Sequence, residues 1–278
     1  VKIEGLKLTS AATTRLDALE HQKLAILGAN FFGRGIVVDG SAAAGIFLYG
    51  AVNAALWGCT VKNTLADAFH VTHGSNGVVG AGLVAELSGD DGFAVVSYGD
   101  ETVCENVQWI GCYANTPGAR GFSVVGGKSV RAVGGRVHLS SATGIYVACE
   151  PSYSTHGVED VYFSGMHLSG CNTSAPSPLH GAIMVYNGRS SSYLVQKVNI
   201  TDVVIRDTDV DAGQQVSLVT DIAGANNIRG VVIKGLTLTG VHPAYLTNIS
   251  NVPTANYILD EVLLADEKRV FVPGSYTM

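Results

Sequence analysis

Apolar and polar residues alternate with a period of two along most of the chain, which is the pattern of β-strands. Many of these short segments begin with a small residue, as at residues 45–48 (GIFL), 144–147 (GIYV) and 182–185 (AIMV). A second series of alternating segments follows the early ones by about a dozen residues, as at 57–61, 82–85 and 110–114. Self-similarity with a period of about 20–50 residues predicts a solenoid or a propeller.

The length of the repeat favours the solenoid. A propeller blade needs four strands in about 40–50 residues, whereas each unit of about 23–25 residues here holds two clear strands. The sequence therefore predicts an all-β protein, a single-stranded right-handed parallel β-helix of about ten coils, in one domain over residues 1–278. Residues 13–22 are a candidate short helix or a long loop, and residues 150–180 are expected to project as a loop. Cys59 and Cys112 share one repeat position and are expected to face the interior.

Three consecutive repeats place a charged residue two positions before a phenylalanine, and the phenylalanines are 24 and 29 residues apart. Equivalent positions of successive coils stack in a β-helix, about 4.8 Å apart. The charged residues of the three repeats are therefore expected to form one column, which consists of Asp67, Asp91 and Arg120. Asp90 should lie beside this column.

Strand alternation predicts which neighbours share the outer face with this column. Residues next to the inward phenylalanines should point outward, and Tyr98 should lie at the far end of its strand. We expect His70 and Tyr146 on the walls of a groove above the acids. The residues expected to bind the substrate there are His70, Tyr49, Tyr146 and Tyr98. The competing interpretation is structural, because Asp and Gly are favoured at tight turns for backbone reasons.

The segments that carry the acids resemble the pectin-lyase-like superfamily of right-handed parallel β-helices, and within it the polygalacturonase family of glycoside hydrolases. That family has Asn-Thr-Asp, Asp-Asp and Gly-His-Gly on three successive coils. Here the three coils read Ala66-Asp67, Asp90-Asp91 and Ala119-Arg120-Gly121. The resemblance implies catalytic roles for Asp67, Asp90 and Asp91, whereas Arg120 replaces the family's histidine.

Glycoside hydrolysis needs one carboxylic acid to protonate the leaving oxygen and a second carboxylate to activate water or attack the sugar. Crowding raises the pKa of a carboxyl group, which supplies the acid. Asp90 or Asp91 is then the acid and Asp67 its partner. Arg120 is expected to bind an acidic group of a sugar, so the expected substrate is an acidic polysaccharide. No cofactor is expected for hydrolysis, and no Cys or His spacing indicates a metal site.

Two other functions remain open from the sequence. The acids could hold calcium beside Arg120 in a polysaccharide lyase or epimerase. The chain also resembles the β-helical shafts of phage tailspikes and adhesins, which implies a homotrimer, an extracellular or virion-surface location, and glycan binding with or without cleavage.

The bulk properties exclude other classes of partner. The net charge is −6 without clustered Lys and Arg, so no nucleic-acid partner is expected. No window of eighteen uninterrupted apolar residues occurs, so no membrane-spanning helix is expected. The first residues show no signal peptide, and the absence of a starting Met predicts a fragment of a longer chain.

Overall fold

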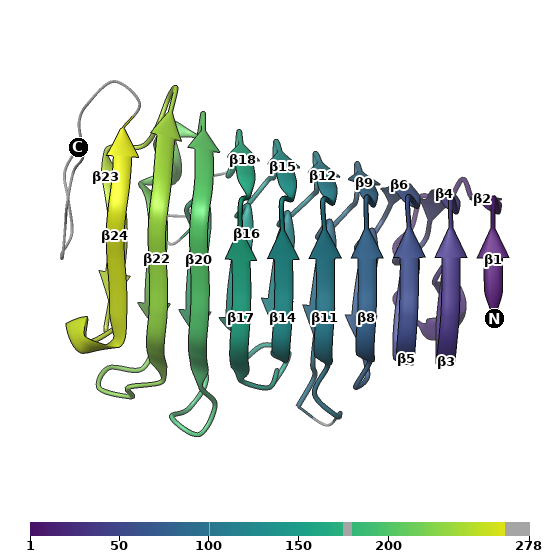
Figure 1. The fold of residues 1–278 in the computed structure, drawn as a ribbon, viewed down its shortest axis with the longest axis horizontal. Helices are drawn as coiled ribbons and strands as arrows, with labels where there is room; N and C mark the ends of the chain where they lie inside the picture. The colour runs from purple at the N-terminus through teal and green to yellow at the C-terminus, as the bar shows by residue number, and fades with distance from the viewer. Residues whose placement is uncertain (100, 175–179, 265–278) are drawn as a thin grey trace.

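The computed structural model describes residues 1–99, 101–174 and 180–264, which form one continuous parallel β-structure of 24 strands. Each strand pairs in parallel with strands of the neighbouring coils, so the chain is a solenoid, as the repeat predicted. Along one face ten strands lie side by side from the N-terminus to the C-terminus (Figure 1), which confirms the expected ten coils. They are β1 (Lys2–Glu4), β3 (Leu24–Arg34), β5 (Ile46–Trp57), β8 (Asn76–Ala81), β11 (Glu105–Ile110), β14 (Gly127–Val133), β17 (Val158–Ser164), β20 (Val195–Arg206), β22 (Ile228–Thr239) and β24 (Tyr257–Leu264).

Two further faces complete each coil. The narrowest contains β2 (Lys7–Thr9), β4 (Val37–Ser41), β6 (Thr60–Thr64), β9 (Val84–Glu86), β12 (Tyr113–Asn115), β15 (Arg136–His138) and β18 (His167–Ser169). It continues through the last residues of β20, β22 and β24. The third face, which carries the acidic column, begins with the first residues of β3 and β5. It continues through β7 (Phe69–Thr72), β10 (Phe93–Val96), β13 (Phe122–Val125), β16 (Ile145–Cys149), β19 (Ile183–Asn187), β21 (Gln214–Thr220) and β23 (Tyr245–Ser250).

Two local predictions need correction. Residues 13–22 form no α-helix; only η1 (Leu19–His21) makes a single 3₁₀ turn, because no apolar stripe of helical period holds the segment against the core. Residues 150–180 do not simply project, because β17 and β18 lie within this range and belong to the stack. The other 3₁₀ turns are η2 (Val210–Ala212) and η3 (Thr254–Asn256). No helix within the described ranges is long and apolar enough to cross a membrane.

The interior is a set of aligned ladders. Phe93 pairs in register with Phe69 on one side and with Phe122 on the other. The ring centroids of these pairs lie 5.1 and 4.7 Å apart, and the rings are stacked. Cys59 and Cys112 are also fully buried, as predicted.

The glycine before Phe122 is required by the packing of its corner. A Cβ atom added to Gly121 would lie 2.3 Å from Val137 Cγ2 and 2.7 Å from the carbonyl oxygen of Gly144. Only a glycine lets the backbone come this close to its neighbours. The corner is thus fixed in position, and the charged residue just before it has a fixed position too.

Candidate active site

The charged column forms at this corner, and its side chains bind the backbone of the next coil. Asp67 Oδ1 accepts a hydrogen bond of 2.8 Å from the backbone N–H of Asp91. Asp91 Oδ1 accepts one of 2.9 Å from the backbone N–H of Arg120, and Ser123 Oγ donates to Asp91 Oδ2. Buried N–H groups need acceptors, so these two aspartates stabilise the turn, as the structural interpretation predicted.

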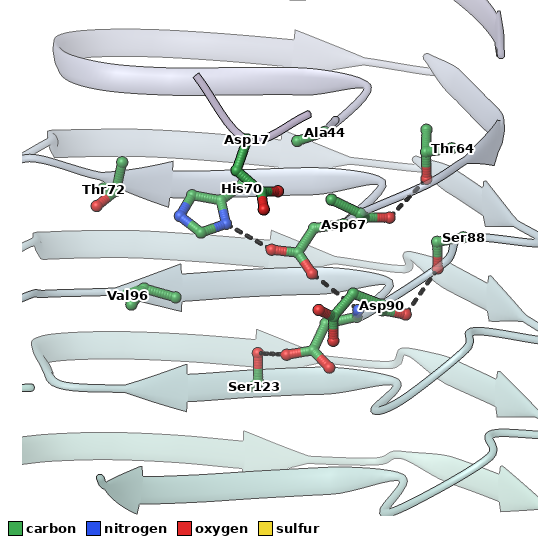
Figure 2. A network of polar contacts seen from close by, with 12 residues as sticks. Asp17, Ala44, Thr64, Asp67, His70, Thr72, Ser88, Asp90, Val96 and Ser123 are labelled. Atoms are coloured by element: carbon green, nitrogen blue, oxygen red, sulfur yellow. Dashed lines mark hydrogen bonds and ion pairs between the residues drawn. The ribbon is translucent and has the colours of Figure 1, made fainter. Parts of the chain in front are cut away.

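The third acid, Asp90, points to the same place from the outer side of the corner. One carboxylate oxygen from each of Asp67, Asp90 and Asp91 lies within 4.8 Å of the other two. Figure 2 shows Asp67 and Asp90 directed toward each other from adjacent coils. The stacking that the sequence predicted is therefore present, and we call these three residues the acidic triad.

A histidine completes the inner side of the triad. His70 Nδ1 lies 2.5 Å from Asp67 Oδ2, and both side chains are nearly buried (Figure 2). Among the described residues, no partner reaches the buried Nε2 atom of His70.

The triad lies at the base of a pocket of about 390 Å³. All the predicted site residues except Tyr146 line this pocket. They are Asp67, Asp90, Asp91, Arg120, His70, Tyr49 and Tyr98. The wall beside Tyr49 is aromatic. The ring centroid of Tyr49 lies 3.6 Å from that of His73, and Phe47 stacks on His70 at 5.0 Å.

Tyr146 was wrongly expected to line the groove. Its side chain does point away from the interior, but it is only 3% exposed. The guanidinium of Arg120 lies 4.5 Å from the centre of the Tyr146 ring, and the Tyr146 hydroxyl donates a hydrogen bond of 2.8 Å to Glu150 Oε1. Alternation predicted the direction of the side chain but not the residues that cover it.

Sequence reasoning missed an N-terminal contribution to the pocket. Arg15 Nη1 lies 2.9 Å from Asp90 Oδ2, and Arg15 Nε lies 2.8 Å from Asp17 Oδ1. The segment is anchored by backbone bonds such as Leu16 N–H to the Ala42 carbonyl oxygen. No local pattern signals this contact, since Arg15 and Asp90 are 75 positions apart.

A second missed residue is Glu150, which follows β16 directly and lines the same pocket. Its carboxylate lies 3.3 Å from Arg120 Nη2. The sequence did contain a signal for this contact, because Glu150 is an acidic residue one coil beyond Arg120, the cation of the column. Tyr153 also lines the pocket, on the segment after Glu150.

Burial and crowding raise the pKa of two members of the triad. Burial is the main cause of a pKa of about 7 for Asp91; nearby Asp67 and Asp90 raise it further, whereas Arg120 opposes them. Burial also raises the pKa of Asp90, with the charge of Asp67 adding to it and Arg15 opposing it. The triad therefore retains a proton near neutral pH.

No protein-family model and no curated protein matches this sequence, so the likeness found is structural. The catalytic domain of a GH87 α-1,3-glucanase in complex with tetrasaccharides superposes with a TM-score of 0.73 at 16% identity, over 95% of this chain and 53% of that chain. A mannuronan C-5 epimerase A-module from Azotobacter vinelandii gives a TM-score of 0.59 at 13% identity, over 85% and 58%. The polygalacturonase from Erwinia carotovora ssp. carotovora gives a TM-score of 0.55 at 14% identity, over 86% of this chain and 59% of the polygalacturonase chain.

The chain is a right-handed parallel β-helix of the pectin-lyase-like fold. The predicted resemblance is thus confirmed at the level of the fold, which is what identities this low establish. The β-helix spans about half the length of the glucanase catalytic domain that it matches. Its activity has to be argued from its own residues.

The raised pKa of Asp91 predicts how the stability of the β-helix depends on pH. The folded chain binds more protons than the unfolded chain between the usual pKa of 3.8 and about 7. This contribution to stability is complete below about pH 4 and is lost as the pH rises through 7. We expect the free energy of unfolding in urea to fall between pH 5 and 8, by up to about 1.4 kcal/mol per pH unit. Asp91→Asn should flatten this slope, and an unchanged slope in the variant would contradict the assignment.

Proposed function

We propose that this β-helix is a glycoside hydrolase that cleaves a polysaccharide at the acidic triad. The observation that carries the proposal is the meeting of three carboxylates within 4.8 Å at the base of a pocket. Two carboxyl groups with different proton affinities are the minimum that this reaction requires. A merely structural corner needs Asp67 and Asp91, which bind backbone N–H groups, but not Asp90.

Exposure assigns the roles within the triad. The side chain of Asp90 is 30% exposed, compared with 12% for Asp67 and 6% for Asp91. Asp90 therefore donates its proton to the glycosidic oxygen as the bond to the sugar carbon breaks. One ionised carboxylate of the triad accepts a proton from the attacking water, and the hydroxide that remains joins the sugar carbon.

The spacing of the acids supports the proposal independently. Alanine variants of three aspartates of the GH87 glucanase have been solved with bound saccharides. Two of these aspartates are adjacent, and the third lies 23 positions before the pair. Asp67, Asp90 and Asp91 have the same spacing.

The alternative of a calcium-dependent lyase or epimerase has one observation in its favour. The triad oxygens are close enough together to hold a cation. The donor set fits calcium poorly, however, because the guanidinium of Arg15 contacts Asp90 and that of Arg120 lies 3.7 Å from Asp91 Oδ1. We expect cleavage to continue unchanged in excess EDTA, whereas abolition by EDTA and recovery with calcium would favour the lyase.

Product analysis tests the proposed reaction. The protein is incubated with soluble polysaccharides, and new reducing ends and the ultraviolet absorbance of unsaturated uronates are both measured. New reducing ends without unsaturation are expected. Unsaturated products would indicate a lyase, and binding without any product would indicate an adhesin. The homotrimer and the extracellular or virion-surface location stay predictions.

A further inference from the structure

The charges on the pocket wall bear on what kind of sugar it accepts. Five carboxylates and two guanidinium groups line it among the described residues. Each guanidinium bridges two of these carboxylates, one in the triad and one outside it. The two bridges are Asp17–Arg15–Asp90 and Asp91–Arg120–Glu150.

The Arg120 bridge is well enclosed. The guanidinium lies 3.3 Å from Glu150 Oε1 and 3.7 Å from Asp91 Oδ1, and it packs on the ring of Tyr146. The side chains of Arg120 and Glu150 are 24% and 11% exposed. An acidic sugar would have to displace Glu150, which would then lose its charged partner inside the protein. Breaking a buried ion pair in this way is strongly unfavourable.

The Arg15 bridge occupies the other guanidinium in the same way. Arg15 Nη1 faces Asp90 and Arg15 Nε faces Asp17. This bridge is more exposed, so it contributes less free energy than the Arg120 bridge. A uronate that approached Arg15 would nevertheless meet Asp17 and Asp90 beside it.

We infer that the pocket accepts an uncharged polysaccharide and that Glu150 excludes acidic ones by holding Arg120. The inference rests on the proposed function and replaces the acidic substrate expected from the sequence. Sugar hydroxyls can donate to the triad, to Asp17 and to Glu150, and the apolar faces of the rings can pack against Phe47 and Tyr49. A sugar carboxylate would find both guanidinium groups already paired and an excess of negative charge around it.

Binding measurements test the inference separately from catalysis. The Asp90→Asn variant is titrated calorimetrically with dextran, laminarin and nigero-oligosaccharides, and the parent protein, in which Asp90 still holds Arg15, is titrated with polygalacturonate and alginate. We expect binding of at least one neutral glycan with little dependence on salt, and no binding of the two acidic polymers. Binding of an acidic polymer, or of none of the neutral ones, overturns the inference.

A gain-of-binding variant tests the role of Glu150 itself. Glu150→Gln retains the size of the side chain but releases Arg120 from one carboxylate. We expect it to bind polygalacturonate or alginate at least about tenfold more tightly than the parent protein, in a salt-dependent way. Glu159→Gln, on the surface strand β17 and paired with Lys197, is the matched control and should change nothing. Folding of both variants is checked by circular dichroism.

The outcomes separate the two proposals. A neutral glycan that binds but is never cleaved refutes the hydrolase and supports the specificity. Cleavage of polygalacturonate or alginate by the parent protein supports the hydrolase and overturns the specificity. A well-folded Glu150→Gln variant without improved binding of acidic polymers overturns the role of Glu150.

Discussion

Replacing Asp90 by asparagine should lower kcat by about 10²-fold or more, with little change in the affinity for the glycan. Asparagine matches aspartate in shape but has no carboxyl proton to transfer, and general acid catalysis contributes about 10²–10⁴-fold to a rate. The backbone at the corner should be unaffected, because the Asp90 side chain pairs with Arg15 rather than with a backbone N–H. Initial rates of reducing-end release and calorimetric binding measure the two effects.

Asp160→Asn is the control for this substitution. Asp160 is an exposed aspartate on β17 that pairs with Arg131 outside the pocket. It should retain full activity. If Asp90→Asn also retained full activity, Asp90 would not be the general acid and the assignment of roles within the triad would be wrong.

Replacing Phe93 by alanine should destabilise the β-helix by about 3–5 kcal/mol, because it removes a large side chain from a close-packed core. Phe93 is fully buried and stacks between Phe69 and Phe122, and its ring also lies 5.5 Å from that of Trp109. The free energy of unfolding in urea measures the loss. Because Phe93 follows Asp91 by two residues, activity should fall as well.

Trp57→Ala serves as the matched substitution outside the core. Trp57 is 48% exposed at the end of β5, so its loss should change stability by no more than about 0.5 kcal/mol. A loss of less than about 1 kcal/mol in Phe93→Ala would show that the phenylalanine ladder is not the main support of the corner.

The parts of this molecule that repeat could be predicted from the sequence. A one-residue shift in register would turn every side chain of a strand to the opposite face. The alignment of Phe69, Phe93 and Phe122 in the sequence therefore implied their stacking. The meeting of Asp67, Asp90 and Asp91 followed from the same register.

The parts that do not repeat could not be predicted. Arg15 reaches Asp90 through a segment without periodicity, and its path depends on bonds to the second coil rather than on its own sequence. Tyr146 points outward as alternation requires, yet Arg120 and Glu150 cover it. Alternation specifies the direction of a side chain relative to the sheet, but burial outside the helix depends on loops whose conformation has no period.

The crystal structure of the Asp90→Asn variant soaked with the neutral oligosaccharide that binds best is the most direct test of the account. We predict that the saccharide lies in the pocket, with one glycosidic oxygen within about 2.6–3.2 Å of the side chain of residue 90. A water held by the other triad carboxylates should lie beside the adjacent sugar carbon. A saccharide bound on another face of the β-helix, with no glycosidic oxygen near the triad, would contradict the account.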